Sequence, residues 1–596
     1  MSGSSFSKTT KLPPTTTGFP LRFDNSFTND LPGDLVVPTA PYDMLPADDD
    51  SGEIPVPQSK FRASRQVRGA LWSWAVPIEH ENPQLVGVSS PGAQLIGLKS
   101  DDFWRDPQLA AAVWSGNKRL LGSHPWAHCY GGHQFGVWAD QLGDGRAISL
   151  GQVYSGPSDV WEVQLKGAGR TPYSRFADGY AVRRSSIREY LAAEHMNALG
   201  VPTSRSLALV FTDRIVEREE PELGAIVTRL APSWVRFGSF ELPASRSDFS
   251  LLRKLADYVI HHHYSELIRP ADDNSNNGGV YIRLLQAVVE RTAAMVAAWQ
   301  AVGFCHGVMN TDNMSILGLT IDYGPYAFLD AYDPDFICNH SDPAGRYAFR
   351  EQPHVALWNL VRLAGPLSRL VGQDPEKDAS SETLEAVTQT LNSFGSEFSR
   401  KYAELMRRKF GLSSDHDIAD MATIVQPYLD LLERGHTDYT FAMRALCDVP
   451  LLLLQKDAGL EQHIDALAAR SDCSRLGSSD WRGDMRAFYE SVYGPRLAAQ
   501  GVIDRDSAKA VGAGMRLANP RHVLRNWVAQ DVIDRVDKSD DDDDDDDHVR
   551  YVDQALELLA THAFDDTVPE HLKDMAERYA GPVPQWGEGL QCSCSS

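Results

Sequence analysis

The 596-residue chain has few cysteines, no long apolar run and no excess of basic charge. Its seven cysteines are odd in number and widely spaced, unlike the disulfide framework of a small secreted domain, so a reducing compartment is expected. A long stretch without a charged residue, 292–311 if His306 is counted as neutral, contains Gln300, Asn310 and two glycines. This composition is typical of a buried helix and loop rather than of a bilayer span, and no transmembrane segment is predicted.

Acidic residues outnumber basic ones. Lysine and arginine number 57 against 81 aspartates and glutamates, which gives a formal net charge of −24, and the eight aspartates at 540–547 contribute a third of it. Because such a chain repels a polyanion, nucleic acid is not an expected partner.

Hydrophobic residues make up 42% of the chain. The chain is also longer than the ~250–300 residues at which one core stops growing, so at least two packed units are predicted.

Residues 1–64 show little periodicity and are rich in Pro, Ser, Thr and Asp, so we expect a mostly disordered leader. The first 23 residues contain no Asp or Glu and carry Lys8, Lys11 and Arg22, which partly matches a mitochondrial transit segment. Pro13 and Pro14 oppose an amphipathic helix there. From composition alone, a disordered cytosolic tail is an equally good interpretation.

The rest of the chain divides into a strand-rich part and a helical part. Strands are predicted over 135–142, 146–153, 160–166, 207–211 and 225–230, with one helix over 186–199. Helices are predicted over 248–264, 281–304, 350–373, 380–410, 417–435, 480–500 and 550–579. We therefore predict an α+β fold with a strand-rich N-lobe, 65–245, and a larger helical C-lobe, 246–580. The C-lobe is predicted to include an acidic loop, 538–548, and the chain to end in a tail, 581–596.

A lysine and a glutamate carry the first functional signal. Lys166 lies on the polar face of the third predicted strand, and Glu189 follows it by 23 residues in the next helix. In protein kinases, a lysine of the third strand contacts the nucleotide phosphates and pairs with a glutamate of the following helix. Each residue also has a simpler explanation. Ser186 and Glu189 match a capping box, and a strand lysine is commonly solvated.

A second motif follows the long apolar helix. His306 and Asn313 have the spacing of the kinase catalytic loop, and Asp322 stands where kinases have the aspartate of their D-F-G motif. A carboxylate and an amide oxygen suit Mg²⁺, or Mn²⁺ in its place, because these ions prefer oxygen ligands. Val308 occupies the position of the kinase catalytic aspartate, and Asp312 is the nearest replacement. The chain is therefore predicted to be an inactive kinase or an enzyme with different chemistry.

Several longer motifs identify a family. They are Y-G-G-H-Q-F-G at 130–136, Q-L-G-D-G-R-A at 141–147, Q-L-K-G-A-G at 164–169, T-P-Y-S-R at 171–175, S-S-I-R-E at 185–189, the whole of 306–324, and C-N-H-S-D at 338–342. These segments closely resemble the selenoprotein O family of protein adenylyltransferases. The resemblance covers about 70–365, and the C-terminal half matches mainly in its C-S-C-S-S ending.

The resemblance implies a protein-kinase-like fold that binds ATP in an inverted pose, so that AMP passes to a protein hydroxyl of Ser, Thr or Tyr and pyrophosphate leaves. The implied ATP-binding residues are Gly143, Gly145, Arg146, Lys166, Asp178, Gly179, Arg229, Arg236 and Asp322, with Glu189 as the ion-pair partner of Lys166. Asn313 and Asp322 would hold Mg²⁺, and Asp312 would be the catalytic proton acceptor. The alternatives are a conventional γ-phosphoryl-transferring kinase and a non-catalytic ATP-binding scaffold.

The resemblance also concerns the tail and the location. Cys594 stands third from the end, where some members have selenocysteine, and the resemblance implies a redox-dependent disulfide between it and Cys338. An exposed, unpaired tail is the alternative. Eukaryotic members are typically mitochondrial, so a mitochondrial location is expected, with the cytoplasm as the alternative. A monomer is expected, with ATP and protein substrates as its partners.

Overall fold

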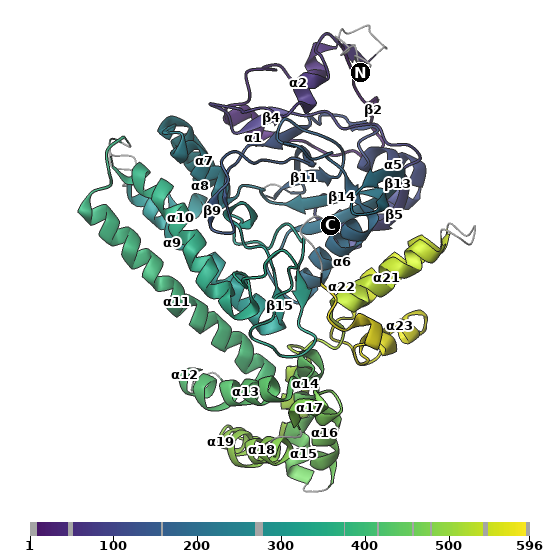
Figure 1. Ribbon diagram of the computed structural model, residues 1–596, viewed down its shortest axis with the longest axis vertical. Coiled ribbons are helices and arrows are strands. Elements are labelled where there is room, and N and C mark those ends of the chain that lie inside the picture. The colour runs from purple at the N-terminus through teal and green to yellow at the C-terminus, as the bar shows by residue number, and fades with distance from the viewer. Residues whose placement is uncertain are drawn as a thin grey trace.

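The computed structural model describes residues 9–45, 52–156, 159–268, 278–372, 374, 376–413, 417–455, 458–476, 480–539 and 546–591. It is a mixed fold of helix and sheet, as predicted (Figure 1). Within these residues no helix is both long and apolar enough to cross a membrane.

An eight-stranded antiparallel sheet dominates the first part of the described chain. Its order is β4 (Trp72–Trp74), β7 (Trp126–His128), β10 (Ala147–Tyr154), β11 (Val160–Lys166), β14 (Pro221–Ala231), β13 (Arg205–Glu217) and β5 (Gln84–Val88). The short β12 (Ala181–Val182) pairs with β14. Glu162 and Gln164 of β11 are fully buried, so the polar face predicted for this strand is an internal polar layer rather than a solvated surface.

The prediction of a strand over 135–142 is wrong. Only a separate hairpin of β8 (His133–Gln134) and β9 (Val137–Trp138) forms there, and β7 takes the predicted place beside β10. Phe135, Gly136 and Asp140 all have positive φ angles, which an extended strand cannot accommodate. The residues of this segment therefore turn back on themselves instead of entering the sheet.

The described part of the leader is packed, in contrast to the expected disorder. Residues 9–45 and 52–64 contain α1 (Ser26–Asp30), α2 (Ser59–Arg62) and two small pairs, β1 (Thr10–Lys11) with β3 (Glu53–Ile54) and β2 (Thr15–Thr16) with β6 (Arg119–Leu120). Phe27 of α1 is 2% exposed and stacks on Trp126 of the main sheet at 4.6 Å. A few large apolar side chains therefore anchor a segment that lacks periodicity.

Helices surround the sheet and continue beyond it. The early helices are α3 (Ser90–Gln94), α4 (Ser100–Trp104), α5 (Pro107–Trp114), α6 (Arg183–Ala198), α7 (Phe237–Ser245) and α8 (Phe249–His263). The long α9 (Gly278–Val302) packs with α10 (Gln352–Val371) and α11 (Ser381–Phe410). Between α9 and α10 lies a loop region with the pair β15 (Phe304–Cys305) and β16 (Ala327–Phe328) and a short 3₁₀ helix (Thr311–Asn313).

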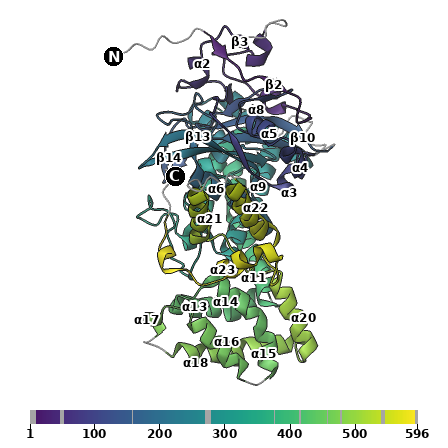
Figure 2. The ribbon, with the colours of Figure 1, turned by 90° about the vertical axis from the view of Figure 1, so that its right-hand side faces the viewer.

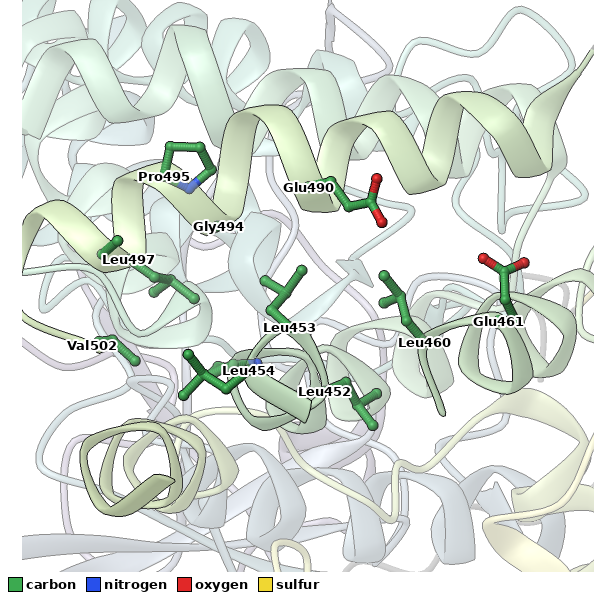
Figure 3. Close-up of a pocket in the computed structure, with 12 residues that line it drawn as sticks. Leu452, Leu453, Leu454, Leu460, Glu461, Glu490, Gly494, Pro495, Leu497 and Val502 are labelled. Atoms are coloured by element: carbon green, nitrogen blue, oxygen red, sulfur yellow. The ribbon is translucent and has the colours of Figure 1, made fainter. Parts of the chain in front are cut away.

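A separate group of helices follows α11, at the bottom of Figure 1. It comprises α12 (Asp417–Asp420), α13 (Gln426–Gly435), α14 (Tyr439–Ala445), α15 (Val449–Gln455), α16 (Gly459–Ala468), α17 (Cys473–Leu476), α18 (Trp481–Phe488), α19 (Gly494–Ala499) and α20 (Arg505–Arg516). Leucines of α15, α16 and α19 line a hollow of about 560 Å³, with Glu461 and Glu490 beside it (Figure 3). None of the predicted site residues lines this hollow.

The last helices return to the sheet. These are α21 (Asn526–Ser539), α22 (Asp546–Thr561) and α23 (Lys573–Tyr579), and α21 and α22 lie beside α6 in both ribbon views (Figure 2). The single helix predicted over 550–579 is thus two helices with a bend between them. Most of the aspartate run, 540–545, and Cys594 lie outside the described residues.

Candidate active site

An ion pair between β11 and α6 lies at the centre of the site. Lys166 ends β11, and its Nζ lies 2.5 Å from Oε2 of Glu189. Because α6 begins at Arg183, Glu189 is in its second turn and does not cap the helix. Burial lowers the pKa of Lys166. Burial alone would raise the pKa of Glu189, but the nearby cations outweigh it and lower this pKa.

A charge network around Asp322 joins this pair to the loop after α9. Oδ1 of Asp322 accepts a hydrogen bond from Nη1 of Arg229 at 2.6 Å, and Oδ2 accepts one from Nη1 of Arg236. Nζ of Lys166 lies 3.9 Å from Oδ1. Burial alone would raise the pKa of Asp322, but Arg236, Arg229 and Lys166 outweigh it and hold the pKa well below its usual range. Asp322 is therefore ionised at neutral pH.

Both arginines are fixed by further contacts. Arg229 lies on β14 and also donates to Oε1 of Glu189 at 2.8 Å and to the side-chain oxygen of Gln164. Arg236 immediately precedes α7 and donates to the backbone carbonyl of Asp312 at 2.6 Å. Their side chains are only 3% and 2% exposed. The two buried guanidinium groups thus share the carboxylate of Asp322, and each also donates to further neutral or charged acceptors.

The turn before β10 closes one side of this network. Gly143 has φ 123°, and a Cβ built on it would lie 2.6 Å from the ring of Tyr173. Gly145 lies against the backbone of the same segment. Asp144, between the two glycines, points inward, and its Oδ1 lies 3.8 Å from Nη2 of Arg236. The glycines therefore allow a close approach that places an acidic side chain beneath the arginine.

Arg146, Asp178 and Gly179 lie next to the network. Burial lowers the pKa of Arg146, while two carboxylates of the network favour its charged form. Arg146 forms no ion pair with any residue that the structure describes. Asp178 is paired with Arg218 at 2.8 Å, and Gly179, with φ 84°, accepts a hydrogen bond from the backbone of Gly169 at 3.1 Å. Arg146 is therefore a cation beside the site that is available to an added anion.

Asp312 lies in a different environment, within the short 3₁₀ helix. Its Oδ2 accepts a hydrogen bond from Nε2 of Gln134 at 3.2 Å, whereas its Oδ1 is buried without a hydrogen-bond partner among the described residues. A Cβ added to Gly132 would lie 2.9 Å from Oδ1. Burial, with no cation in direct contact, raises the pKa of Asp312 to about 6. This carboxylate has one oxygen that can accept a proton at neutral pH.

Asn313 and Asp322 offer oxygen atoms to a cation. Nδ2 of Asn313 donates to the carbonyl of Val308 at 2.9 Å, which orients the amide and leaves its oxygen for another ligand. The described residues contain no group of three or more His, Cys, Asp or Glu side chains that could hold a metal by itself. One carboxylate and one amide oxygen nevertheless fit Mg²⁺, which commonly takes its remaining ligands from phosphates and water.

Comparison with known proteins identifies the family. A family model described as "Protein adenylyltransferase SelO" matches residues 62–552. The chain belongs to this family. A protein of Bordetella petrii named protein nucleotidyltransferase YdiU is 45% identical over 529 residues, which cover 88% of this chain and 96% of that protein. A YdiU protein of Thiobacillus denitrificans is 42% identical over 87% of this chain and 95% of its own length. The family predicted from the sequence motifs is confirmed.

In this SelO-family chain, the C-terminal helices hold α6. His195 of α6 is fully buried, and its Nδ1 lies 2.9 Å from the carbonyl of Leu559 in α22. Its Nε2 accepts a hydrogen bond from the backbone of Leu524 at 3.3 Å. Arg188, the neighbour of Glu189, donates to the side-chain oxygen of Asn526 at 3.2 Å. The helix that presents Glu189 is therefore positioned by residues more than 300 positions later in the chain.

Cys338 is fully buried beside the start of the loop 306–324. Its thiol donates to the carbonyl of Cys305 at 3.4 Å. Nε2 of Gln591, the last described residue, donates to the carbonyl of Ile337 at 2.9 Å. The described end of the tail therefore lies beside the residue that precedes Cys338.

Sequence reasoning missed several residues of the site. Asp144 lies between the two glycines of the Q-L-G-D-G-R-A motif, and an acidic residue in this setting is a usable signal for an inward-pointing side chain. Gln164 alternates with Leu165 and lies on the same face of its strand as Lys166, and this pattern gives no sign of its contact with Arg229. Gln134 and Gly132, which contact Asp312, lie in the Y-G-G-H-Q-F-G motif just before the strand predicted over 135–142, and no periodicity marks them.

Proposed function

We propose that this protein is an ATP- and Mg²⁺-dependent adenylyltransferase that moves AMP to Ser, Thr or Tyr hydroxyls of proteins and releases pyrophosphate. Its fold would be of the bilobal protein-kinase type, with 65–245 as the N-lobe and 246–580 as the C-lobe. The family supports the reaction class. The observation that carries the proposal is the pairing of a cation cluster around Asp322 with a separate, weakly contacted carboxylate, Asp312.

The cations have a clear use in this proposal. A bound triphosphate carries three to four negative charges and needs several fixed positive groups. Arg146, Lys166, Arg229 and Arg236 provide them in a chain whose net charge is −24. Arg229 and Arg236 would stabilise charge that develops on the α-phosphoryl group and the departing pyrophosphate. Gly143, Gly145, Asp178 and Gly179 would line the nucleotide.

Asp312 would accept the proton of the acceptor hydroxyl. Its pKa, raised to about 6 by burial, leaves it ionised at neutral pH but more basic than an ordinary aspartate. The hydroxyl would approach Oδ1, which has no hydrogen-bond partner in the described structure. Gln134 would hold the other oxygen and so fix the orientation of the carboxylate.

Asn313 and Asp322 would hold Mg²⁺, with Mn²⁺ as the alternative. When bound, such an ion neutralises phosphate charge and acts as a Lewis acid. Asp322 would have to release part of its contact with Arg229 and Arg236 as the nucleotide enters, and the phosphates would then take up these guanidinium groups. The residues therefore fit both the nucleotide-free and the loaded site.

We also propose a redox switch, in which Cys338 and Cys594 form a disulfide when a two-electron oxidant such as glutathione disulfide removes two electrons and accepts two protons. The position of Gln591 beside Ile337 supports this pairing. Peptide mapping without reductant tests it: a linked peptide pair is expected after oxidation, and Cys338 that stays alkylatable would contradict the switch. A mitochondrial location and a monomeric state complete the proposal.

The transfer reaction is tested with ATP labelled on either the α- or the γ-phosphate. We expect protein-bound label only from α-labelled ATP in the wild type, and none in Asp322→Ala. Label retained only from the γ-phosphate would identify a conventional kinase. No transfer from either position, together with retained ATP binding, would identify a non-catalytic scaffold.

A further inference from the structure

The hairpin β8–β9 lies directly against the catalytic loop and presents apolar side chains outward. The backbone of His133 donates to the hydroxyl of Thr311 at 2.7 Å, and Gln134 contacts Asp312. At the tip, Phe135 is 40% exposed, and Val137 is 70% exposed. The hairpin thus joins a contact with the proposed proton acceptor to an exposed apolar surface.

The tip of the hairpin has an unusual backbone. Phe135 has φ 49° and Gly136 has φ 83°, so both central residues of the turn are left-handed. This geometry suits a tight hairpin, but a bulky aromatic residue rarely occupies it and pays a cost in strain. The backbone N–H of Phe135 is held by the side-chain oxygen of Asn310 at 3.1 Å and by the hydroxyl of Tyr347. Strain held in place beside a reaction site is a feature of ligand-binding segments.

Two arginines flank the hairpin. The guanidinium group of Arg346 lies 3.2 Å from the position of a Cβ on Gly136, and it also lies over the ring of Trp358 at 4.8 Å. Arg362 of α10 lies over the same ring at 4.6 Å. Trp358 in turn contacts His133 of the hairpin, with ring centroids 5.5 Å apart. Hairpin, tryptophan and arginines therefore form one continuous surface.

No acidic side chain lies within ion-pair distance of these two arginines among the described residues. Neither Arg346 nor Arg362 forms an ion pair with a carboxylate in the described parts of the chain, and their Nε atoms have no hydrogen-bond partner there. The nearby carboxylate of Glu241 is engaged by Nδ1 of His133 at 2.6 Å. Burial raises the pKa of Glu241, and the charge of Arg362 acts on it in the opposite direction without an ion-pair contact. In a chain with 81 acidic residues, two arginines beside the site that form no ion pair in the described structure favour an acidic group on a bound partner.

We propose that Phe135, Val137, Arg346, Trp358 and Arg362 form an acceptor-binding surface for protein substrates. It selects an extended segment that carries an apolar side chain and one or more Asp or Glu residues close to the acceptor hydroxyl. The apolar side chain packs on the hairpin, the carboxylate pairs with the arginines, and the hydroxyl faces Asp312. This inference rests on the proposed adenylyltransferase function and adds the class of acceptor to it.

The test uses the full chain, α-labelled ATP and synthetic peptides with a single Ser, Thr or Tyr. Each hydroxyl is flanked by leucine and by either two glutamates or two lysines. We expect kcat/KM to be about tenfold higher for the glutamate peptides, because a hydrogen-bonded charge pair contributes on the order of that factor. Most of the difference should appear in KM.

Variants of the surface test which residues cause the preference for glutamate peptides over lysine peptides. The double variant Arg346→Ala, Arg362→Ala should reduce the preference to below about twofold, and Arg346→Glu with Arg362→Glu should reverse it toward lysine peptides, with ATP affinity unchanged in both. Val137→Asp should raise KM for the leucine-containing peptides. The matched control is Arg482→Ala with Arg486→Ala on α18, which removes two surface arginines from another region and should leave the preference intact.

Transfer to casein, used as a general protein acceptor, distinguishes failure of the acceptor-binding surface from failure of the adenylyltransferase function. Transfer to casein with no charge preference among the peptides would overturn the acceptor-binding surface and leave the adenylyltransferase function standing. A preference that persists in the arginine variants, accompanied by weaker ATP binding, would assign these arginines to the nucleotide instead and also overturn it. Absence of transfer to casein and to every peptide would remove both proposals.

Discussion

Asp312 and Asp322 lie ten residues apart in one loop region, yet their surroundings have opposite effects. Asp322, with 21% of its side chain exposed, contacts two arginines and has a pKa well below its usual range. Asp312 is less exposed, contacts only an amide group through its side chain, and has a pKa raised to about 6. Contact with cations, rather than depth of burial, decides which carboxylate stays ionised and which can take up a proton.

In the proposed reaction, the two carboxylates would therefore serve different needs. A group that holds a cation and orders arginines should never lose its charge. A group that accepts a proton needs a pKa near the working pH. Neutralising each in turn should consequently give opposite changes in stability, although both changes should abolish most of the activity.

The largest effect is expected from Asp322→Asn. AMP transfer should fall by about 1000-fold, because the variant removes the charge of the proposed metal ligand and disrupts the arginines proposed to bind phosphate. Arg229 and Arg236 would be left buried without their shared carboxylate, so the free energy of unfolding should fall by about 3 kcal/mol. Transfer of α-label and urea denaturation measure the two quantities. Unchanged stability would show that the arginines do not depend on Asp322.

Asp312→Asn should lower kcat by about 100-fold, as expected for loss of a general base. In metal-free protein it should also increase stability. A carboxyl whose pKa is raised on folding stabilises the folded state only while protonated, so wild-type stability is lost as pH rises from about 4 to about 6. The variant should therefore gain up to about 3 kcal/mol over the wild type between pH 4 and pH 7. Urea denaturation in EDTA at both pH values measures this gain, and a constant difference would contradict the raised pKa.

Glu189→Gln tests the second carboxylate that Arg229 contacts. Activity should fall by about 20-fold, because Lys166 loses the charge that orients it toward phosphate. Glu194→Gln is the matched control: Glu194 lies on the same helix and is paired with Arg205 at 2.6 Å, away from the site. The control should lower the melting temperature and leave kcat/KM nearly unchanged. Equal losses of activity in both variants would mean that helix stability alone explains the effect.

The smallest expected change comes from Gly132→Ala. The added methyl group would press on Oδ1 of Asp312 and should reduce kcat by about tenfold without changing the dissociation constant for ATP. Gly395→Ala on α11 is its control, since a Cβ there meets nothing within 4 Å. That variant should stabilise the helix by about 0.5–1 kcal/mol and keep full activity. Normal activity in Gly132→Ala would indicate that the carboxylate can move aside.

Local patterns predicted the parts of the fold that depend on neighbouring residues. Strands expected over 146–153 and 160–166 are found at Ala147–Tyr154 and Val160–Lys166, because alternation and turn residues determine them locally. The prediction of a strand over 135–142 was wrong because positive φ angles at isolated residues do not alter the periodicity of the sequence. The prediction of a disordered leader was wrong for a related reason. Single apolar side chains such as Phe27, which stacks on Trp126, hold the segment in place without any periodic pattern in the sequence.

The sequence indicated which residues belong to the site, but not which of them contact one another. Lys166 and Glu189 follow from a strand and helix that are adjacent in the chain. The joining of Arg229 and Arg236 to Asp322 spans 93 and 86 residues, and nothing in sequence spacing indicates it. Only the family resemblance suggested these arginines. The contacts of Gln134 and Gly132 with Asp312 span even longer separations and were not anticipated.

The contacts of α21, α22 and Leu524 with α6 have a consequence for biosynthesis. A ribosome releases the sheet and the loop 306–324 well before it has made Leu524, Asn526 and Leu559, which contact His195 and Arg188. Until then, the helix that carries Glu189 lacks its support. The nascent protein should thus remain inactive until residues up to Leu559 have been made, and a copy that ends before Leu524 should lack transfer activity.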